Sequence, residues 1–112
     1  MTKQMTIVID LEGIVLEKEE SPKPFIFGPT KPDVSEFLRE MKAAGYKVIV
    51  HVSRPREEES AMMDYLEAVG IAGLVSEFNF GERIKGGCIA EGVWTMRELA
   101  DAIHRAAGME IR

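Results

Sequence analysis

Two carboxylates follow the first hydrophobic run of the chain. Asp10 and Glu12 come directly after residues 6–9, a Thr-Ile-Val-Ile run that predicts a strand buried on both faces. A carboxylate at the end of such a strand can attack an electrophile, transfer a proton or bind a divalent cation. Asp10 could equally be a turn residue before Gly13, and Glu12 a solvated loop acid, so both alternatives stay open.

Ser53 and Arg54 follow a second hydrophobic run, residues 47–52. A hydroxyl and a guanidinium both donate hydrogen bonds to phosphate oxygens, and the backbone amides that begin the next helix favour an anion at the same place. Arg54 could instead pair with Glu57 or Glu58, and we favour this pairing slightly.

Strand patterns and helix patterns alternate along the chain. This order predicts right-handed crossovers and a mostly parallel sheet, with functional residues just beyond the carboxyl ends of the strands. The last helix is expected to begin with a capping box, residues 95–98. The expected strands are residues 6–9, 47–52, 74–75 and 88–90; the expected helices begin at residues 30–33 with a hydroxyl cap, after residue 55 and at residue 95, and end at Gly45, Gly70 and Gly108.

Residues 6–15 resemble the first motif of the haloacid dehalogenase (HAD) family, an apolar strand followed by Asp-x-Asp-Gly-Thr. Residues 34–55 are similar to the helix and second strand of small HAD proteins, and residues 81–93 stand where the family has a Lys-Pro and then an acidic pair. The resemblance implies an α/β fold: a three-layer, Rossmann-like parallel sheet with helices on both faces. It also implies one domain over residues 1–112, with a small flap over residues 14–29 after the first strand.

The family reaction passes through an aspartyl-phosphate, with a second acid for proton transfer and Mg²⁺ to neutralise charge. The resemblance makes Asp10 and Glu12 vestigial candidates for catalysis. In the preferred alignment Val52 and Glu82 stand at the phosphate-binding positions, so Ser53, through a one-residue slip, and Lys85, close in sequence, are the candidate replacements. Arg54, at the start of a helix, is a further phosphate-binding candidate, and Asp10 and Glu91 are weak metal-binding candidates.

Four positions depart from the family pattern, and each departure removes a group that the reaction needs. Two hydroxyls are lost, a phosphate-binding cation becomes an acid, and one metal-binding acid disappears. These positions are Ile14, Val52, Glu82 and Ala90. Losing one group that stabilises the transition state typically costs about 10²–10³ in kcat.

The leading hypothesis is therefore an inactive or very weak HAD-like domain that acts as a binding or regulatory module. The alternative is a Mg²⁺-dependent phosphohydrolase of a small phosphate ester that uses Asp10 as nucleophile. A third hypothesis is a sensor that binds a phosphorylated ligand through Arg54 without turnover. We expect no cofactor, or Mg²⁺ if the domain is active.

Composition limits the partners. The net charge of −5 and the scattered basic residues argue against nucleic acid, and no apolar run reaches the roughly 18 residues of a membrane span. The single cysteine, Cys88, is expected to be a buried small hydrophobe and suits the cytoplasm. An unknown protein partner or self-association is expected, with Phe25, Ile26 and Phe27 as a candidate patch. His51 is expected to pack within the sheet, and Trp94 to act as a hydrophobic staple before the last helix.

Overall fold

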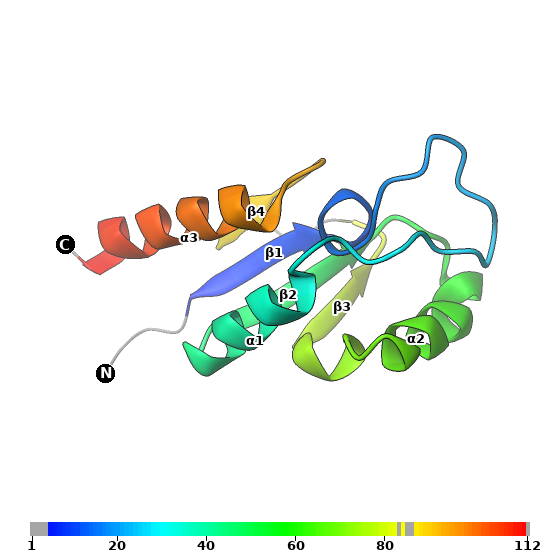
Figure 1. The fold of residues 1–112 in the computed structure, drawn as a ribbon, viewed down its shortest axis with the longest axis horizontal. Helices are drawn as coiled ribbons and strands as arrows, with labels where there is room; N and C mark the ends of the chain where they lie inside the picture. The colour runs from blue at the N-terminus through cyan, green and yellow to red at the C-terminus, as the bar shows by residue number, and fades with distance from the viewer. Residues whose placement is uncertain (1–4, 83, 85–86, 112) are drawn as a thin grey trace.

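The computed structural model describes residues 5–82, 84 and 87–111, and within the last helix it describes side chains as far as residue 107. Its centre is a four-stranded sheet in which every pairing is parallel, in the order β3-β2-β1-β4 (Figure 1). The strands are β1 (Thr6–Asp10), β2 (Lys47–Val52), β3 (Glu77–Phe80) and β4 (Cys88–Ala90). The predicted α/β class and Rossmann-like parallel sheet are confirmed.

Three helices pack against this sheet: α1 (Val34–Ala43), α2 (Glu59–Ala68) and α3 (Met96–Ile111). Right-handed crossovers through β1, β2 and β3 place α1 and α2 on the same face, and α3 contacts α1 and β4. Figure 1 shows all three helices in front of the strands. The described helices thus lie over one face, where we had expected helices on both, because residues 81–87 between β3 and β4 are too few for a crossover helix.

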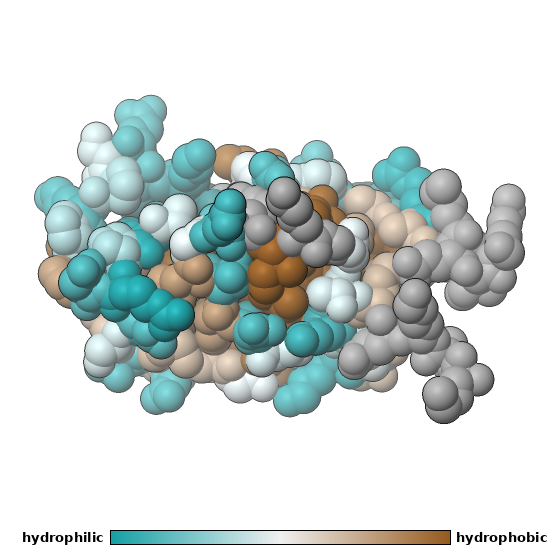
Figure 2. Space-filling view, turned by 180° about the vertical axis from the view of Figure 1, so that it is seen from behind, coloured by the Kyte–Doolittle hydropathy of each residue, from teal (hydrophilic) through white to brown (hydrophobic). Residues whose placement is uncertain are grey.

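The core lies between this helical layer and the sheet. The inward-facing strand residues Ile7, Ile9, Val48 and Val50 are almost fully buried, together with helix residues such as Leu99. Their strand neighbours point the other way: by register, the side chains of Val8, Ile49 and Ile89 share the opposite face. Figure 2 shows that face, with hydrophobic atoms at its middle and hydrophilic side chains around them.

Three element boundaries differ from the prediction, and two of them lie at the third strand and at α1. The strand expected at residues 74–75 begins at Glu77 instead, because a 3-10 turn (Ala72–Leu74) takes up the first of these residues, and Glu77–Phe80 are the residues that pair with β2. The hydroxyl cap expected for α1 is wrong. Asp33 occupies the N-cap position with φ of 64° and no side-chain cap, while Thr30 forms a β-bridge with Leu16.

The ends of α1 and α2 and the start of α3 follow the predicted signals, whereas α3 continues past Gly108, its predicted end, to Ile111. Gly45 and Gly70 adopt the left-handed conformation just after α1 and α2. The capping box of α3 is present: the Thr95 hydroxyl accepts from the Glu98 N–H at 3.1 Å, and Glu98 accepts from the Thr95 N–H at 3.0 Å. This second contact lowers the pKa of Glu98 below its ordinary value. Within the described residues, no helix combines the length and the apolar composition needed to cross a membrane.

The flap is shorter than predicted. Ile14, Val15 and Leu16 are fully buried, because the chain first makes a single wide helical turn in which the Leu16 N–H donates to the Leu11 carbonyl at 2.8 Å. The flap proper is residues 17–29, closed at its base by the bridge between Leu16 and Thr30. Figure 1 shows it as an irregular loop that projects beyond the carboxyl ends of the strands.

Candidate functional site

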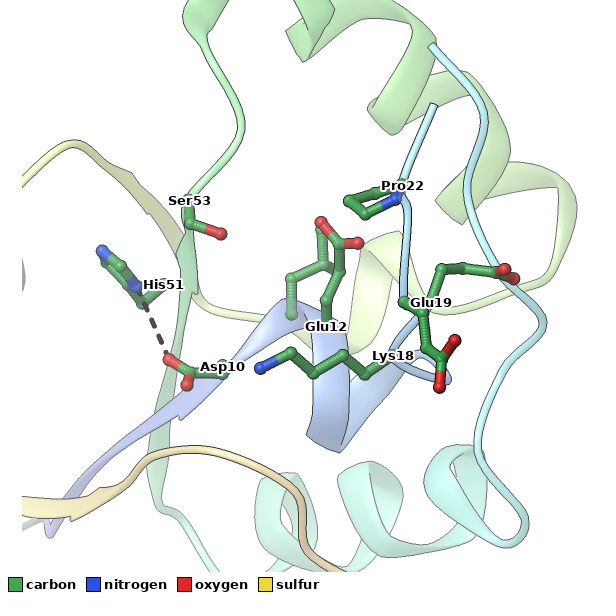
Figure 3. A pocket seen from close by; sticks show the side chains of 9 residues that line it. Asp10, Glu12, Lys18, Glu19, Pro22, His51 and Ser53 are labelled. Atoms are coloured by element: carbon green, nitrogen blue, oxygen red, sulfur yellow. Dashed lines mark ion pairs between the residues drawn. The ribbon is translucent and has the colours of Figure 1, made fainter. Parts of the chain in front are cut away.

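A pocket of about 270 Å³ lies at the carboxyl ends of β1 and β2, under the flap (Figure 3). It brings together three predicted site residues, Asp10, Glu12 and Ser53, although they come from two separate strands. Its lining is Asp10, Leu11, Glu12, Lys18, Glu19, Glu20, Pro22, His51 and Ser53. The carboxyl ends of parallel strands lie at the same edge of the sheet, which explains why these residues meet.

Asp10, at the end of β1, is held by its surroundings. One carboxylate oxygen, Oδ2, accepts a hydrogen bond from the Gly92 N–H at 3.0 Å, and Oδ1 lies 3.5 Å from Nδ1 of His51. The side chain of Asp10 is 17% exposed. Asp10 therefore links the ends of three strands, and both of its oxygens have protein partners.

His51 bridges Asp10 and the loop after β3. Its Nε2 is 2.9 Å from the Gly81 carbonyl, and because a carbonyl can only accept, Nε2 must carry a hydrogen. Nδ1 then faces Asp10, and the contact becomes an ion pair when Nδ1 is protonated as well. His51 lines the pocket but is also a structural link between two strand ends, close to the packing role that we had expected.

Glu12 is clamped by Arg54. The Arg54 Nε lies 2.7 Å from Glu12 Oε1, and Nη2 lies 3.2 Å from Oε2, which is a bidentate pair. The side chains of Arg54 and Glu12 are 7% and 13% exposed. Glu12 is thus a paired and largely buried carboxylate, and the expectation of a solvated loop acid is wrong.

Arg54 binds the flap with its remaining donors. Its Nη1 donates to Glu58 at 2.7 Å and to the Lys23 carbonyl at 3.0 Å, and its Nη2 donates to the Ile26 carbonyl at 2.8 Å. With the two bonds to Glu12, all five N–H donors of the guanidinium have protein partners. The predicted phosphate-binding role of Arg54 is therefore not supported, and its pairing with Glu58 is what the structure contains.

Electrostatics reinforce this clamp, which we define as Glu12, Arg54 and Glu58. The hydrogen bond to Glu12 raises the pKa of Arg54 above its ordinary value, against the opposing effect of burial. Glu58 also accepts the Phe25 N–H at 2.8 Å, and this bond is the main reason that the pKa of Glu58 is lowered. Both shifts favour the charged forms of Arg54 and Glu58.

Aromatic side chains attach the flap to α2. The Phe27 ring stacks on Tyr65 with 5.9 Å between centroids, and the Arg54 guanidinium lies 4.5 Å from the Phe27 centroid. The Tyr65 hydroxyl donates to the Gly28 carbonyl at 2.8 Å. Phe27 is thus part of the flap's attachment, and only Phe25 and Ile26 of the predicted patch are well exposed.

The pocket contains a cation that sequence reasoning missed. Lys18 extends from the flap into the pocket, with its ammonium pointing toward Asp10 (Figure 3). The sequence placed Lys18 within an acidic run, and only the closure of the flap brings it over the strand ends. The predicted phosphate-binding lysine, Lys85, lies outside the described residues.

The candidate metal ligands do not fit Mg²⁺. Glu91 is not among the residues that line the pocket, and the oxygens of Asp10 and Glu12 are already engaged. In the part of the chain that the structure describes, no three His, Cys, Asp or Glu side chains gather where they could hold a metal ion. Magnesium prefers a near-octahedral set of oxygen ligands, which this arrangement does not supply.

Gly13 allows the two loops beside Asp10 to meet. It has a φ of 108°, and a Cβ on it would lie 2.3 Å from the Gly92 carbonyl oxygen. The Trp94 N–H also donates to the Gly13 carbonyl at 3.1 Å, and the Trp94 indole donates to the Glu91 carbonyl at 2.8 Å. These contacts fix the loop that presents the Gly92 N–H to Asp10.

Comparison with known proteins identifies the fold alone. No protein-family profile and no curated protein sequence matches the chain. A solved structure described as a conserved protein coded by a locus from Bacteroides thetaiotaomicron is similar, with a TM-score of 0.71 and 17% sequence identity, over 93% of each chain. This likeness supports the α/β architecture and carries no information about activity.

Proposed function

We propose that this chain is a HAD-like domain without significant phosphatase activity that acts as a binding or regulatory module. The observation that carries the proposal is the engagement of the polar groups at the strand ends. All five donors of Arg54 are used within the protein, and Asp10 accepts the Gly92 N–H at one carboxylate oxygen while the other lies 3.5 Å from His51. A phosphate that entered the pocket would have to displace these bonds before it could be attacked.

The charge of the pocket supports the same conclusion. Four of the lining residues are acids; Arg54 neutralises Glu12, which leaves Asp10, Glu19 and Glu20 against Lys18, the one lysine in the lining. A phosphate ester carries negative charge, and two unit charges 4 Å apart interact by roughly 4 kcal/mol at an effective dielectric near 20. Without a bound cation, the pocket repels the substrate class that the HAD reaction requires.

Turnover of phosphate esters tests this proposal. Phosphate release is measured from an aryl phosphate, and from a panel of nucleotides and sugar phosphates, with Mg²⁺ present. The Asp10→Asn variant, which keeps a carbonyl oxygen to accept the Gly92 N–H, is the matched control. We expect equal background release from both proteins; release by the native chain that Asp10→Asn abolishes would overturn the proposal.

The second candidate is a Mg²⁺-dependent phosphohydrolase of a small phosphate ester with Asp10 as nucleophile. One observation favours it: Asp10 and Ser53 line the same pocket, and Lys18 points into it (Figure 3). The third candidate, a phosphate-ligand sensor, predicts thermal stabilisation by inorganic phosphate without turnover. A Lys18→Met variant separates these candidates from the first, because only they predict that the change weakens a phosphate-dependent signal.

We also propose a cytoplasmic location. The single cysteine, Cys88, supports it, because a chain with one cysteine cannot form an internal disulfide of the kind common in oxidising compartments.

A further inference from the structure

The flap exposes two large hydrophobic side chains next to each other. Phe25 is 57% exposed and Ile26 is 60% exposed, and we call this pair the flap tip. Their neighbour Phe27 packs on Tyr65. The loop therefore partly buries one of its three consecutive apolar side chains and leaves the other two in solvent.

The backbone that carries the flap tip is fixed, so this exposure is built into the fold. Phe25 has a φ of 62°, a left-handed conformation that is unfavourable for a bulky residue and persists only where its surroundings enforce it. Glu58 holds the Phe25 N–H, and Arg54 holds the carbonyls of Lys23 and Ile26. The backbone is thus held at Phe25 and on both sides of it.

A fixed backbone favours binding by the flap tip. Side chains that are already positioned lose less conformational freedom on association, so more of the contact energy appears as affinity. An aromatic side chain beside an aliphatic one is also the kind of anchor that fills a pocket on a protein surface. The same surface gives a free chain no stabilisation, since both side chains face water.

The charges around the flap tip indicate the kind of partner. Glu19, Glu20 and Glu57 are exposed on the flap and in the short helical turn before α2, against Lys18 and Lys23. Arg56 is exposed there too, but it is paired with Glu59, and the whole chain carries −5. This acidic surround favours a basic border on the partner and disfavours an anionic membrane. It also disfavours a second copy of this chain, which would bring the same acids.

We propose that the flap tip docks into an apolar pocket, bordered by basic side chains, on a protein partner. This inference rests on the proposed binding function and names its surface and the chemistry of its partner. Two side chains bury far less surface than the total of about 1,200–2,000 Å² that is typical of stable complexes. The flap tip is accordingly the anchor of a larger contact.

The test uses a double variant that removes the flap tip without changing the backbone. Phe25→Asn tolerates a left-handed conformation, and Ile26→Ser is its neighbour. The control is Val93→Ser, which removes another apolar side chain, 64% exposed, from the loop before α3. Thermal unfolding of all three purified chains checks that each is folded.

The experiment first identifies proteins that bind to the native chain but not to the double variant. Each of these proteins is then purified, and its binding is measured by titration calorimetry. We expect the double variant to raise Kd at least about tenfold, the loss of about 1.4 kcal/mol expected for an anchor residue. Val93→Ser is expected to change Kd less than about twofold, within the small effect typical of non-anchor contacts. Added salt should weaken the complex, because opposite charges border the contact.

Three results would overturn the inference. The first is that no protein is retained by the native chain and lost by the double variant. The second is a Kd that the double variant leaves within about twofold of the native value, the range of near-neutral contacts. The third is a flap-tip-dependent shift in sedimentation, or binding to vesicles of phosphatidylcholine and phosphatidylserine, which would assign the surface to a second copy or a membrane. Phosphate release that depends on Asp10 would overturn the proposed function alone, since the flap tip is measured separately.

Discussion

Replacing Arg54 with methionine is the most informative perturbation of this fold. The guanidinium is 7% exposed, pairs with Glu12 and Glu58, and holds two flap carbonyls. Methionine keeps much of the volume and the contact with Phe27 but supplies no donor. The change therefore leaves two largely buried carboxylates without their cation.

The expected cost follows from this arrangement. Removing one member of a buried ion pair typically costs about 3–5 kcal/mol, because the remaining charge is left uncompensated. A domain of this size has a total unfolding free energy of about 5–15 kcal/mol. At a urea m-value of about 1.5 kcal/mol/M, the midpoint should fall by about 2 M or more.

The assay is equilibrium urea unfolding at neutral pH, followed by circular dichroism. Arg56→Met is the matched control: it removes the same charge two residues away, where the side chain is 70% exposed and pairs with Glu59. Exposed pairs contribute about 1 kcal/mol or less, so this control should stay close to the native protein. Adding Glu12→Gln and Glu58→Gln to Arg54→Met should restore at least about 1 kcal/mol by removing the uncompensated charges. A difference between Arg54→Met and Arg56→Met below about 1 kcal/mol, the value of an exposed pair, would refute the reasoning.

Three further predictions concern the same loops. Hydrogen bonds lower the pKa of Glu58 from the ordinary 4.5, so Glu58 stabilises the fold above that pH, and this stability is lost as the pH falls through the lowered pKa. The Glu58→Gln variant should lose that part of the pH dependence, which urea unfolding at a series of acidic pH values measures. Gly13→Ala should lower the unfolding free energy by at least about 2 kcal/mol, because it adds backbone strain and a clash with the Gly92 carbonyl. The control Gly45→Ala, with nothing within 4 Å of its Cβ, should cost only about 1–2 kcal/mol of strain. Similar losses for the two variants in thermal unfolding would argue against the clash. Trypsin should cleave after Lys18 faster in Arg54→Met than in the native chain, and equal rates by gel electrophoresis would show that Arg54 does not hold the flap.

The strands and helices were largely predictable from local signals. The β-branched runs at residues 6–9 and 47–52 form central strands, and the glycines after α1 and α2 end those helices as expected. The third strand was predicted too early in the chain because residues 74–75 are apolar and also pack on the core, but from a 3-10 turn and its end, whereas the pairing with β2 begins at Glu77. The single-sided helical layer could not be read from periodicity, since it depends on the length of the β3–β4 connection.

The site was predictable in location but not in its interactions. The rule that parallel strands open at one edge placed Asp10, Glu12 and Ser53 in one pocket. The bond between Glu12 and Arg54 joins residues 42 positions apart, and no spacing rule on one helix or strand indicates such a pair. Lys18 was missed for the same reason, because its position depends on how the flap folds back.

The side chain of Arg54, just after β2, joins the floor of the pocket to the flap. Glu12 lines the pocket, and the same Arg54 that neutralises it also holds the carbonyls of Lys23 and Ile26. A cationic ligand that took Glu12 from Arg54 would therefore loosen the flap, and by thermodynamic reciprocity a partner that holds the flap in place would weaken that ligand by the same factor. Binding of such a ligand and engagement of the flap would then be linked equilibria, with Arg54 as one of the contacts that join them.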